Sequence, residues 1–336
     1  MRCVVFGGAG FIGSRLCAAL LTPALRQLVI ADNLCGPGSM WLIAPLLSDP
    51  RVSFVPLDVA EAGDFARLPA GPFDRVYHLA ASFANELSER APALDYQTNV
   101  VGTANVLHFA ERAGVRHLTY AGSSSSYGAA PQPLVESGPM SPETAYARNK
   151  LAGEQLVRAA AVPWTIFRLF NVYGPGDYPG RFRNAIPNMM AAVKRGEALK
   201  LYGEGCTRDF NFIDDILGPL CAPEQAAGRV LNLSGGREVS IEALIEALRC
   251  AAGRPDHAVE RAPMRSWDGV QRRTADTTAL NQLYGALPHT PLASGLARTW
   301  AWFQAQDFGE SATLTAAHWA PSSSPSSSSP PAAFVR

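Results

Sequence analysis

The chain has 336 residues, which is long for one ordinary domain and short for three, and 47% of them are hydrophobic while 17% are charged. Such a chain can bury a sizeable core and is not disordered as a whole. Its formal net charge is +0, whereas a nucleic-acid-binding surface normally shows as an excess of basic residues. No apolar run approaches the roughly 20 residues that span a bilayer, and the start does not resemble a signal peptide. We therefore expect no nucleic-acid partner and no membrane association.

The six cysteines are scattered along the chain, and no two of them form a CxxC pair. Disulfide frameworks and structural zinc sites favour closer and more regular spacing. We therefore expect reduced thiols, a cytoplasmic protein and no metal site.

Apolar runs alternate with helical patterns over the first half of the chain. Strands are predicted at 2–6, 28–31, 52–56, 75–79, 117–121 and 164–169. Helices are predicted at 11–21 and 96–113. This alternation is typical of right-handed βαβ units, so the fold class is α/β with a doubly wound, mostly parallel sheet.

The second half of the chain is less regular. A loop-rich stretch with many Gly, Pro and Arg residues runs over 171–209, and further helices are predicted around 186–195, 240–250 and 296–306. We expect a doubly wound domain at 1–170 with a return segment at about 211–235. A smaller lobe is expected from 171–210 and 236–318. The Ser/Pro-rich end, 319–336, is predicted to be disordered.

A glycine-rich turn follows the first predicted strand. Gly7 to Gly13 fits GxxGxxG and opens the first helix, an arrangement that lets the backbone approach a pyrophosphate at a helix N-terminus. Asp32 lies 19 residues beyond Gly13, at the end of the second strand, where a carboxylate holds the adenosine ribose. Asp58 follows the third strand. A carboxylate at position 32 would repel a 2′-phosphate, so the pattern favours NAD over NADP.

A second motif, YxxxK, is formed by Tyr146 and Lys150, which lie on one face of a helix. We expect the ammonium to lower the phenol pKa from its usual value of about 10, because a general base must work near neutral pH. Upstream, the fifth strand ends in four serines, beginning at Ser123. Their hydroxyls reach the carboxyl edge of the sheet, where open α/β folds bind ligands.

Together these motifs resemble the extended short-chain dehydrogenase/reductases, and among them the nucleotide-sugar epimerases and dehydratases. The resemblance covers about residues 2–305. It is carried by GGAGFIG, DNL, YHLAA, TNVVGT, SSSSYG, YARNK, FNVYGPG and RDF. It implies a Rossmann-type sheet with a smaller C-terminal lobe that binds the nucleotide sugar, and a tightly held NAD that is regenerated in each cycle.

The resemblance also implies roles for single residues. Ser123 would bind the sugar hydroxyl that is oxidised, Tyr146 would be the acid/base, and Lys150 would hold the nicotinamide ribose and tune Tyr146. Asn99 would support the site through its helix, whereas His78 is predicted to be a packed core residue. The implied cofactor-binding residues are Gly7, Gly10, Phe11, Ile12, Gly13, Asp32, Asn33, Asp58, Val59, Leu79, Ala80, Ala81, Asn99, Tyr146 and Lys150.

By the same resemblance, the nucleotide sugar would be held by Asn171 and by arginines that suit phosphate. Arg208 and Arg265 would contact the diphosphate, and Asp268 the nucleoside ribose. The alternatives are a surface ion pair of Arg208 with Asp209 or Asp214, and a solvated Arg265.

Several arginines and serines bear on which sugar the protein binds. Arg181 or Arg183 falls near the arginine of hexuronate 4-epimerases, and Ser124 and Ser125 resemble the carboxylate-binding loop of those enzymes. Arg272 falls near a gate position at the far edge of the sugar. The alternative is that these arginines only reflect an arginine-rich genome.

The serine loop also bears on the reaction. Loops of 4,6-dehydratases resemble TDEVYG, those of decarboxylases TSEVYG and those of 3,5-epimerases SSACIYP. The Glu or Cys of these loops aligns with Ser125, and the dehydratase Asp with Ser124. A serine hydroxyl is a poor general acid or base. The sequence therefore favours a UDP-hexose or UDP-hexuronate 4-epimerase, UDP-glucuronate included, that forms a transient 4-keto sugar.

The sequence is also compatible with other functions. The same scaffold supports a 4,6-dehydratase with a relocated acid, a decarboxylase, a 2-epimerase or a ketosugar reductase. A non-catalytic NAD-binding scaffold protein is a reading of another class, against which Ser123, Tyr146 and Lys150 argue. The family usually dimerises through two helices of each subunit, so we expect a homodimer that uses 99–113 and 146–161.

Overall fold

The computed structural model describes residues 1–36, 39–265, 269–306 and 308. Asp268 and the tail at 319–336, both subjects of sequence predictions, lie outside the described residues. No helix of the described part is long and apolar enough to cross a membrane.

The larger part of the molecule is built on a seven-stranded sheet in the order β10-β6-β5-β4-β1-β2-β3. Every pair of neighbouring strands runs parallel. The strands are β1 (Arg2–Phe6), β2 (Gln27–Asp32), β3 (Val52–Pro56), β4 (Arg75–His78), β5 (His117–Ser123), β6 (Trp164–Leu169) and β10 (Val230–Leu233). The predicted doubly wound sheet is confirmed, and β10 joins it at one edge.

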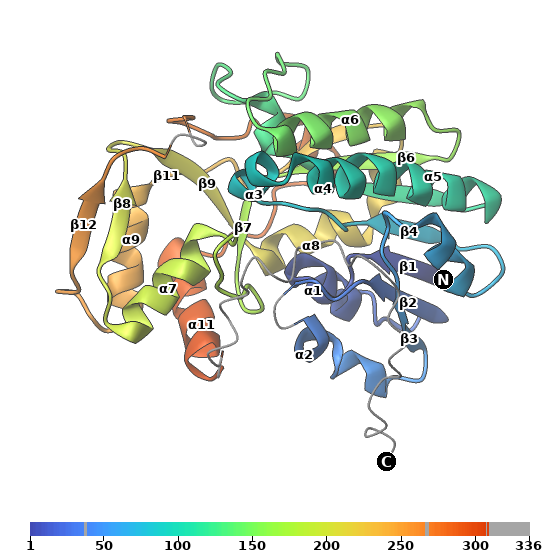
Figure 1. Ribbon diagram of the computed structural model, residues 1–336, viewed down its shortest axis with the longest axis horizontal. Coiled ribbons are helices and arrows are strands. Elements are labelled where there is room, and N and C mark those ends of the chain that lie inside the picture. The colour runs from blue at the N-terminus through green and yellow to red at the C-terminus, as the bar shows by residue number, and fades with distance from the viewer. Residues whose placement is uncertain (37–38, 266–268, 307, 309–336) are drawn as a thin grey trace.

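Helices cover both faces of this sheet (Figure 1). One face carries α1 (Phe11–Ala19) and α8 (Ile213–Cys221), and the other carries α5 (Gly102–Arg112) and α6 (Ala145–Ala159). The alternation of side chains along β1 separates the two cores, because Cys3 and Val5 belong to one hydrophobic cluster and Val4 and Phe6 to the other.

A smaller lobe lies beside the carboxyl ends of the parallel strands (Figure 1). Its three-stranded sheet contains β7 (Asn171–Tyr173), β9 (Thr207–Phe212) and β11 (Glu238–Ser240), and β8 (Leu199–Tyr202) pairs with β12 (Val259–Ala262). Its helices are α7 (Ala185–Arg195), α9 (Ile241–Ala251), α10 (Thr278–Tyr284) and α11 (Leu292–Gln304). Three of these helices were predicted from the sequence, but none of these strands was, and four of the strands are only three or four residues long.

The helix predicted at 96–113 is longer and less regular than expected. Helical structure runs through α4 (Pro92–Tyr96), a π-helical turn (Gln97–Val101) and α5. Asn99 is buried in this turn, and its Nδ2 donates to the backbone oxygen of Ser82 at 2.8 Å. Single π-helical turns often occur beside functional sites.

Helix α6 packs very closely on β5 and on this turn. A Cβ atom at Gly153 would overlap the hydroxyl of Tyr120 and would lie 3.0 Å from the backbone oxygen of Asn99. Glycine at this position therefore sets how near α6 comes to the sheet.

We predict that Gly153→Ala destabilises the protein by about 1–3 kcal/mol, because the added methyl group overpacks the interface. The matched variant Gly63→Ala has open space around its Cβ and should be neutral or stabilising by up to about 1 kcal/mol. Urea unfolding of the two variants measures the difference. Equal midpoints would contradict the close packing.

Candidate functional site

The main cleft lies at the carboxyl ends of the parallel strands, where the sheet faces the smaller lobe. It spans the point between β1 and β4 at which the strand order reverses, the usual ligand site of open α/β folds. The residues predicted from the sequence that line it are Gly7, Gly10, Phe11, Ile12, Gly13, Asp32, Asn33, Asp58, Val59, Leu79, Ala80, Ala81, Ser123, Ser124, Ser125, Tyr146, Lys150, Asn171, Arg183 and Arg208.

The glycine-rich turn forms one end of the cleft. Gly7 has φ +78°, and a Cβ there would lie 2.5 Å from the backbone nitrogen of Ala80. The turn therefore excludes side chains and leaves the N-terminus of α1 open, which suits a pyrophosphate.

Asp32 stands beside this turn at the end of β2. Its carboxylate accepts from the backbone nitrogens of Ala9 at 3.0 Å and Leu34 at 2.8 Å, and the residue is only partly buried. Asn33 Nδ2 donates to Asp58 Oδ2 at 2.9 Å in the same part of the cleft. Backbone donors thus fix the carboxylate that would meet a ribose, so this end of the cleft fits an adenine dinucleotide.

The catalytic motifs meet at the other end. Ser123 ends β5, and Tyr146 and Lys150 enter the cleft from α6, so Tyr146 forms a hydrogen bond with Ser123. The hydroxyl of Thr144 accepts from Ala147 N at 3.2 Å and caps α6, which fixes the start of the helix just before Tyr146.

The predicted lowering of the phenol pKa by Lys150 is wrong for the protein without ligands. Burial raises the pKa of Tyr146 to about 12, against the effects of the Ser123 hydrogen bond and the charge of Arg273. Burial likewise lowers the pKa of Lys150 to about 7, and the charge of Asp95 opposes this. The Lys150 ammonium lies 4.2 Å from the centre of the ring of Tyr120, so its charge faces this core residue.

Three predicted residues do not line the cleft. Arg181 is exposed and lies 3.9 Å from the carboxylate of Glu86. Arg265 is also exposed, and its guanidinium lies 3.8 Å from the centre of the Tyr202 ring. Asn99 is buried behind the cleft, where it supports the turn described above.

Arg272, which was predicted at the gate position, also does not line the cleft, and its neighbour Arg273 does. Arg272 is exposed and pairs with Glu238 at 2.7 Å, whereas Arg273 lines the cleft and acts on Tyr146. Successive side chains of an extended segment point to opposite sides, so an error of one residue exchanges solvent for cleft. Arg273 was not predicted from the sequence for this reason.

The other predicted residues are held in place by their neighbours. Arg183 Nη2 donates to the buried Asp177 at 2.9 Å, and its guanidinium lies 4.6 Å from the centre of the Phe83 ring. Arg208 Nη1 donates to the backbone oxygen of Thr207 at 2.8 Å. His78 is buried as predicted, and its Nε2 lies 3.0 Å from the hydroxyl of Thr103.

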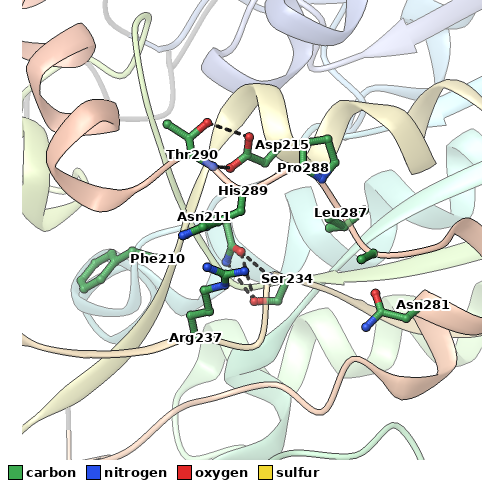
Figure 2. Close-up of a pocket in the computed structure, with 12 residues that line it drawn as sticks. Phe210, Asn211, Asp215, Ser234, Arg237, Asn281, Leu287, Pro288, His289 and Thr290 are labelled. Carbon is green, nitrogen blue, oxygen red and sulfur yellow. Dashed lines mark hydrogen bonds between the residues drawn. The ribbon is translucent and has the colours of Figure 1, made fainter.

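A second, smaller pocket of about 140 Å³ lies beside β9 and α8 (Figure 2). Its polar groups bond to one another: Asn211 Nδ2 donates to Ser234 Oγ at 3.0 Å, and the hydroxyl of Thr290 donates to Asp215 at 2.8 Å. None of the predicted site residues in the described part of the chain lines it. The main cleft is therefore the candidate active site.

Comparison with known proteins agrees with this geometry. The model of the NAD dependent epimerase/dehydratase family matches residues 3–227. The chain belongs to this family. Its cofactor is accordingly NAD, which fits the cleft end formed by Gly7 and Asp32.

Relatives within the family have different activities. A UDP-glucose 4-epimerase from Mycolicibacterium smegmatis is 32% identical over 313 residues, which cover 90% of this chain and 99% of the relative. A dTDP-glucose 4,6-dehydratase from Streptomyces venezuelae, solved with NAD, is 30% identical with a TM-score of 0.83, and the match covers 90% of this chain and 97% of that one.

A third relative is a UDP-glucuronic acid 4-epimerase from Bacillus cereus, solved with UDP-glucuronic acid and NAD. It is 27% identical with a TM-score of 0.81, and the match covers 90% of this chain and 99% of that one. The chain is thus an enzyme of the nucleotide-sugar epimerase/dehydratase type, and overall similarity does not separate epimerases from dehydratases.

We predict that Asp32→Ala weakens NAD binding by about 1.5–3 kcal/mol, roughly 10- to 150-fold, because a charge-assisted hydrogen bond to the ribose is lost. Titration calorimetry on protein stripped of cofactor measures this change. Asp49→Ala, which removes a half-buried partner of Arg51 outside the cleft, serves as the control. Unchanged NAD affinity in Asp32→Ala would overturn the ribose assignment.

Proposed function

We propose that this family member is an NAD-dependent 4-epimerase of a UDP-hexose or UDP-hexuronate. One observation carries the proposal: among the described residues that line the cleft, the only carboxyl side chains are Asp32 and Asp58. Both lie at the ends of β2 and β3, on the nucleotide side. No carboxyl group among the described residues that line the cleft therefore accompanies Ser123 and Tyr146 as a second acid or base. Asp95, whose charge raises the pKa of Tyr146, does not line the cleft and accepts from Asn149 Nδ2 at 2.8 Å.

The loop after β5 supports the same reading. Ser124 and Ser125 line the cleft at the positions where dehydratases and decarboxylases would carry acids. Elimination of water and loss of CO₂ both require a proton to be moved at a carbon or oxygen other than O4. Serine hydroxyls perform this poorly, whereas exchange of configuration at C4 requires only one acid/base.

The proposed roles follow from the geometry. Ser123 Oγ would hold the O4 hydroxyl of the sugar, and Tyr146 Oη would take its proton and later return it. NAD, when bound, supplies the acceptor and donor of the hydride at C4. Arg273 would favour the phenolate, since its positive charge lowers the pKa of Tyr146, and Lys150 would hold the nicotinamide ribose. A 4-keto sugar that turns over in the cleft before reduction becomes the C4 epimer.

The diphosphate would lie between the sheet and the smaller lobe. Asn171 Nδ2 is buried and has no hydrogen-bond partner among the described residues, so it is available to a phosphate or sugar oxygen. Arg208 lines the same part of the cleft. Arg265 and Asp268 remain candidates for the outer phosphate and the nucleoside ribose.

The sugar subsite has features that suit an acidic sugar. Arg183 and Arg273 place two guanidinium groups in the cleft, and Ser124 and Ser125 add hydroxyls beside Ser123. A carboxylate that is buried without such partners loses many kcal/mol of hydration free energy. We therefore extend the proposal to a hexuronate such as UDP-glucuronate.

We also propose a homodimer, with α5 and α6 at the interface. Leu156 on α6 and Tyr96 on the adjoining α4 are large apolar residues that are exposed in the single chain. Burial of such residues against a second copy would stabilise the pair.

We predict that Tyr146→Phe lowers kcat by about two to four orders of magnitude and leaves substrate binding nearly unchanged, as expected for loss of a general acid/base. Steady-state kinetics with the accepted nucleotide sugar measure both quantities. The control is Tyr284→Phe, which removes a hydroxyl far from the cleft that donates to Ala222 O at 3.1 Å. Near-normal kcat in Tyr146→Phe would remove this residue from the mechanism.

We predict that UDP-glucuronate is epimerised at least as well as UDP-glucose. In Arg273→Met, kcat/KM should fall for both substrates, because Arg273 also lowers the pKa of Tyr146, and the fall should be at least tenfold larger for UDP-glucuronate than for UDP-glucose. Arg272→Met is the matched control, because this neighbouring arginine lies outside the cleft.

The products are identified by NMR. Activity on UDP-glucose alone would remove the acidic-sugar assignment, and a large yield of UDP-pentose would show that Ser125 does not prevent decarboxylation.

A further inference from the structure

A buried arginine connects the two elements that carry the catalytic groups. Arg168 lies on β6 and is 2% exposed, and it donates to both carboxylate oxygens of Glu154 on α6, at 2.9 Å and 2.6 Å. Its Nη1 donates to the hydroxyl of Tyr127 at 2.7 Å and to the backbone oxygen of Glu136 at 3.0 Å. One guanidinium thus bonds to the helix and to the serine loop at once.

On the loop side, the contact is with the last residue of the serine turn. Tyr127 ends the 3₁₀ turn Ser124–Tyr127, which directly follows Ser123, and it is fully buried. Its hydroxyl donates to Asn232 Oδ1 at 2.6 Å, so the turn is also tied to β10.

On the helix side, the partner of Arg168 lies on the same face of α6 as Tyr146 and Lys150. Tyr146, Lys150 and Glu154 are four residues apart on α6 and therefore share one face of the helix. Glu154 is 1% exposed and lies on this face about two turns beyond Tyr146. Because Arg168 holds Glu154, its guanidinium also fixes the position of Tyr146 along and around the axis of α6.

Stability alone does not explain this arrangement. Removing two charges from water costs several kcal/mol per ion, and a well-packed apolar pair of similar volume is often as stable or more stable. The ion pair differs from an apolar pair in its geometry, because the two parallel N–H groups of a guanidinium fix both the distance and the angle of the carboxylate.

We propose that Arg168, Glu154 and Tyr127 form a positioning clamp that sets the distance between Ser123 Oγ and Tyr146 Oη. The clamp would hold the serine turn and α6 in the register in which both groups reach the same sugar hydroxyl. The effect on turnover rests on the proposed function, whereas the coupling between turn and helix does not.

The first test removes only one hydroxyl. Tyr127→Phe loses the bonds from Arg168 and to Asn232 while the ring stays in place. We expect kcat to fall at least tenfold while KM changes less than threefold and bound NAD is retained. Unchanged kcat in a folded Tyr127→Phe protein would overturn the clamp.

The second test separates positioning from stability. The double variant Arg168→Met/Glu154→Leu replaces the ion pair by apolar groups and should unfold at the same or a higher urea concentration than the wild type, yet with a tenfold or greater loss of kcat. The control is Arg195→Met/Glu197→Leu, which removes an exposed ion pair and should leave kcat unchanged. A stable and fully active Arg168→Met/Glu154→Leu protein would overturn the proposal.

A third readout does not depend on the substrate. In the holoenzyme, backbone amides of 123–127 and 145–150 should exchange with solvent at least tenfold faster in Tyr127→Phe than in the wild type, while those of β1 stay unchanged. Equal exchange would overturn the coupling. A wild-type protein that converts no nucleotide sugar would overturn the proposed function, and the exchange data would still decide the coupling.

Discussion

The architecture of the site depends on one face of α6, which buries a phenol, an ammonium and a carboxylate against the sheet. Each of the three groups meets a different partner: Tyr146 bonds to Ser123, Lys150 lies over the Tyr120 ring, and Glu154 pairs with Arg168. Burial alone would keep the phenol protonated and the amine neutral. A base at this position therefore needs nearby positive charge to offset that burial, and Arg273 is the cation of the described chain that lowers the pKa of Tyr146.

The chemistry of the cleft follows from which groups are near the phenol. Because carboxyl groups occur only at the Asp32 end of the described lining, the end that holds Tyr146 has one phenol, the amine of Lys150 and several hydroxyls. This composition suits the proposed removal and return of a hydride at C4 and of a proton at O4. Relatives with similar overall identity perform either epimerisation or dehydration. The fold itself therefore does not determine which of these reactions takes place.

The sequence predicted the sheet, and the glycine and aspartate residues that it singled out line one end of the cleft, because both features depend on local patterns. The turn at Gly7 and the carboxylate of Asp32 are contiguous with strands that alternation reveals. The sugar end was predicted less well, because Arg272 and Arg273 differ only in the direction of their side chains, and Arg181 lies in a loop without periodicity. The clamp at Arg168 joins residues that are distant in sequence, so only the folded chain brings it together. The pKa of Tyr146 depends on burial, which the YxxxK spacing does not indicate.

The most direct test of the proposed reaction is ¹H NMR of products formed in D₂O from UDP- and dTDP-hexoses and UDP-hexuronates. A 4-epimerase gives the C4 epimer with every carbon-bound hydrogen retained, since the hydride removed from C4 returns to the same carbon. This is the result expected here, with a UDP-sugar as substrate. A 4-keto-6-deoxy sugar that carries deuterium at C5 would show elimination of water, because the proton removed beside the ketone exchanges with solvent. That product would contradict the account of a cleft with a single acid/base.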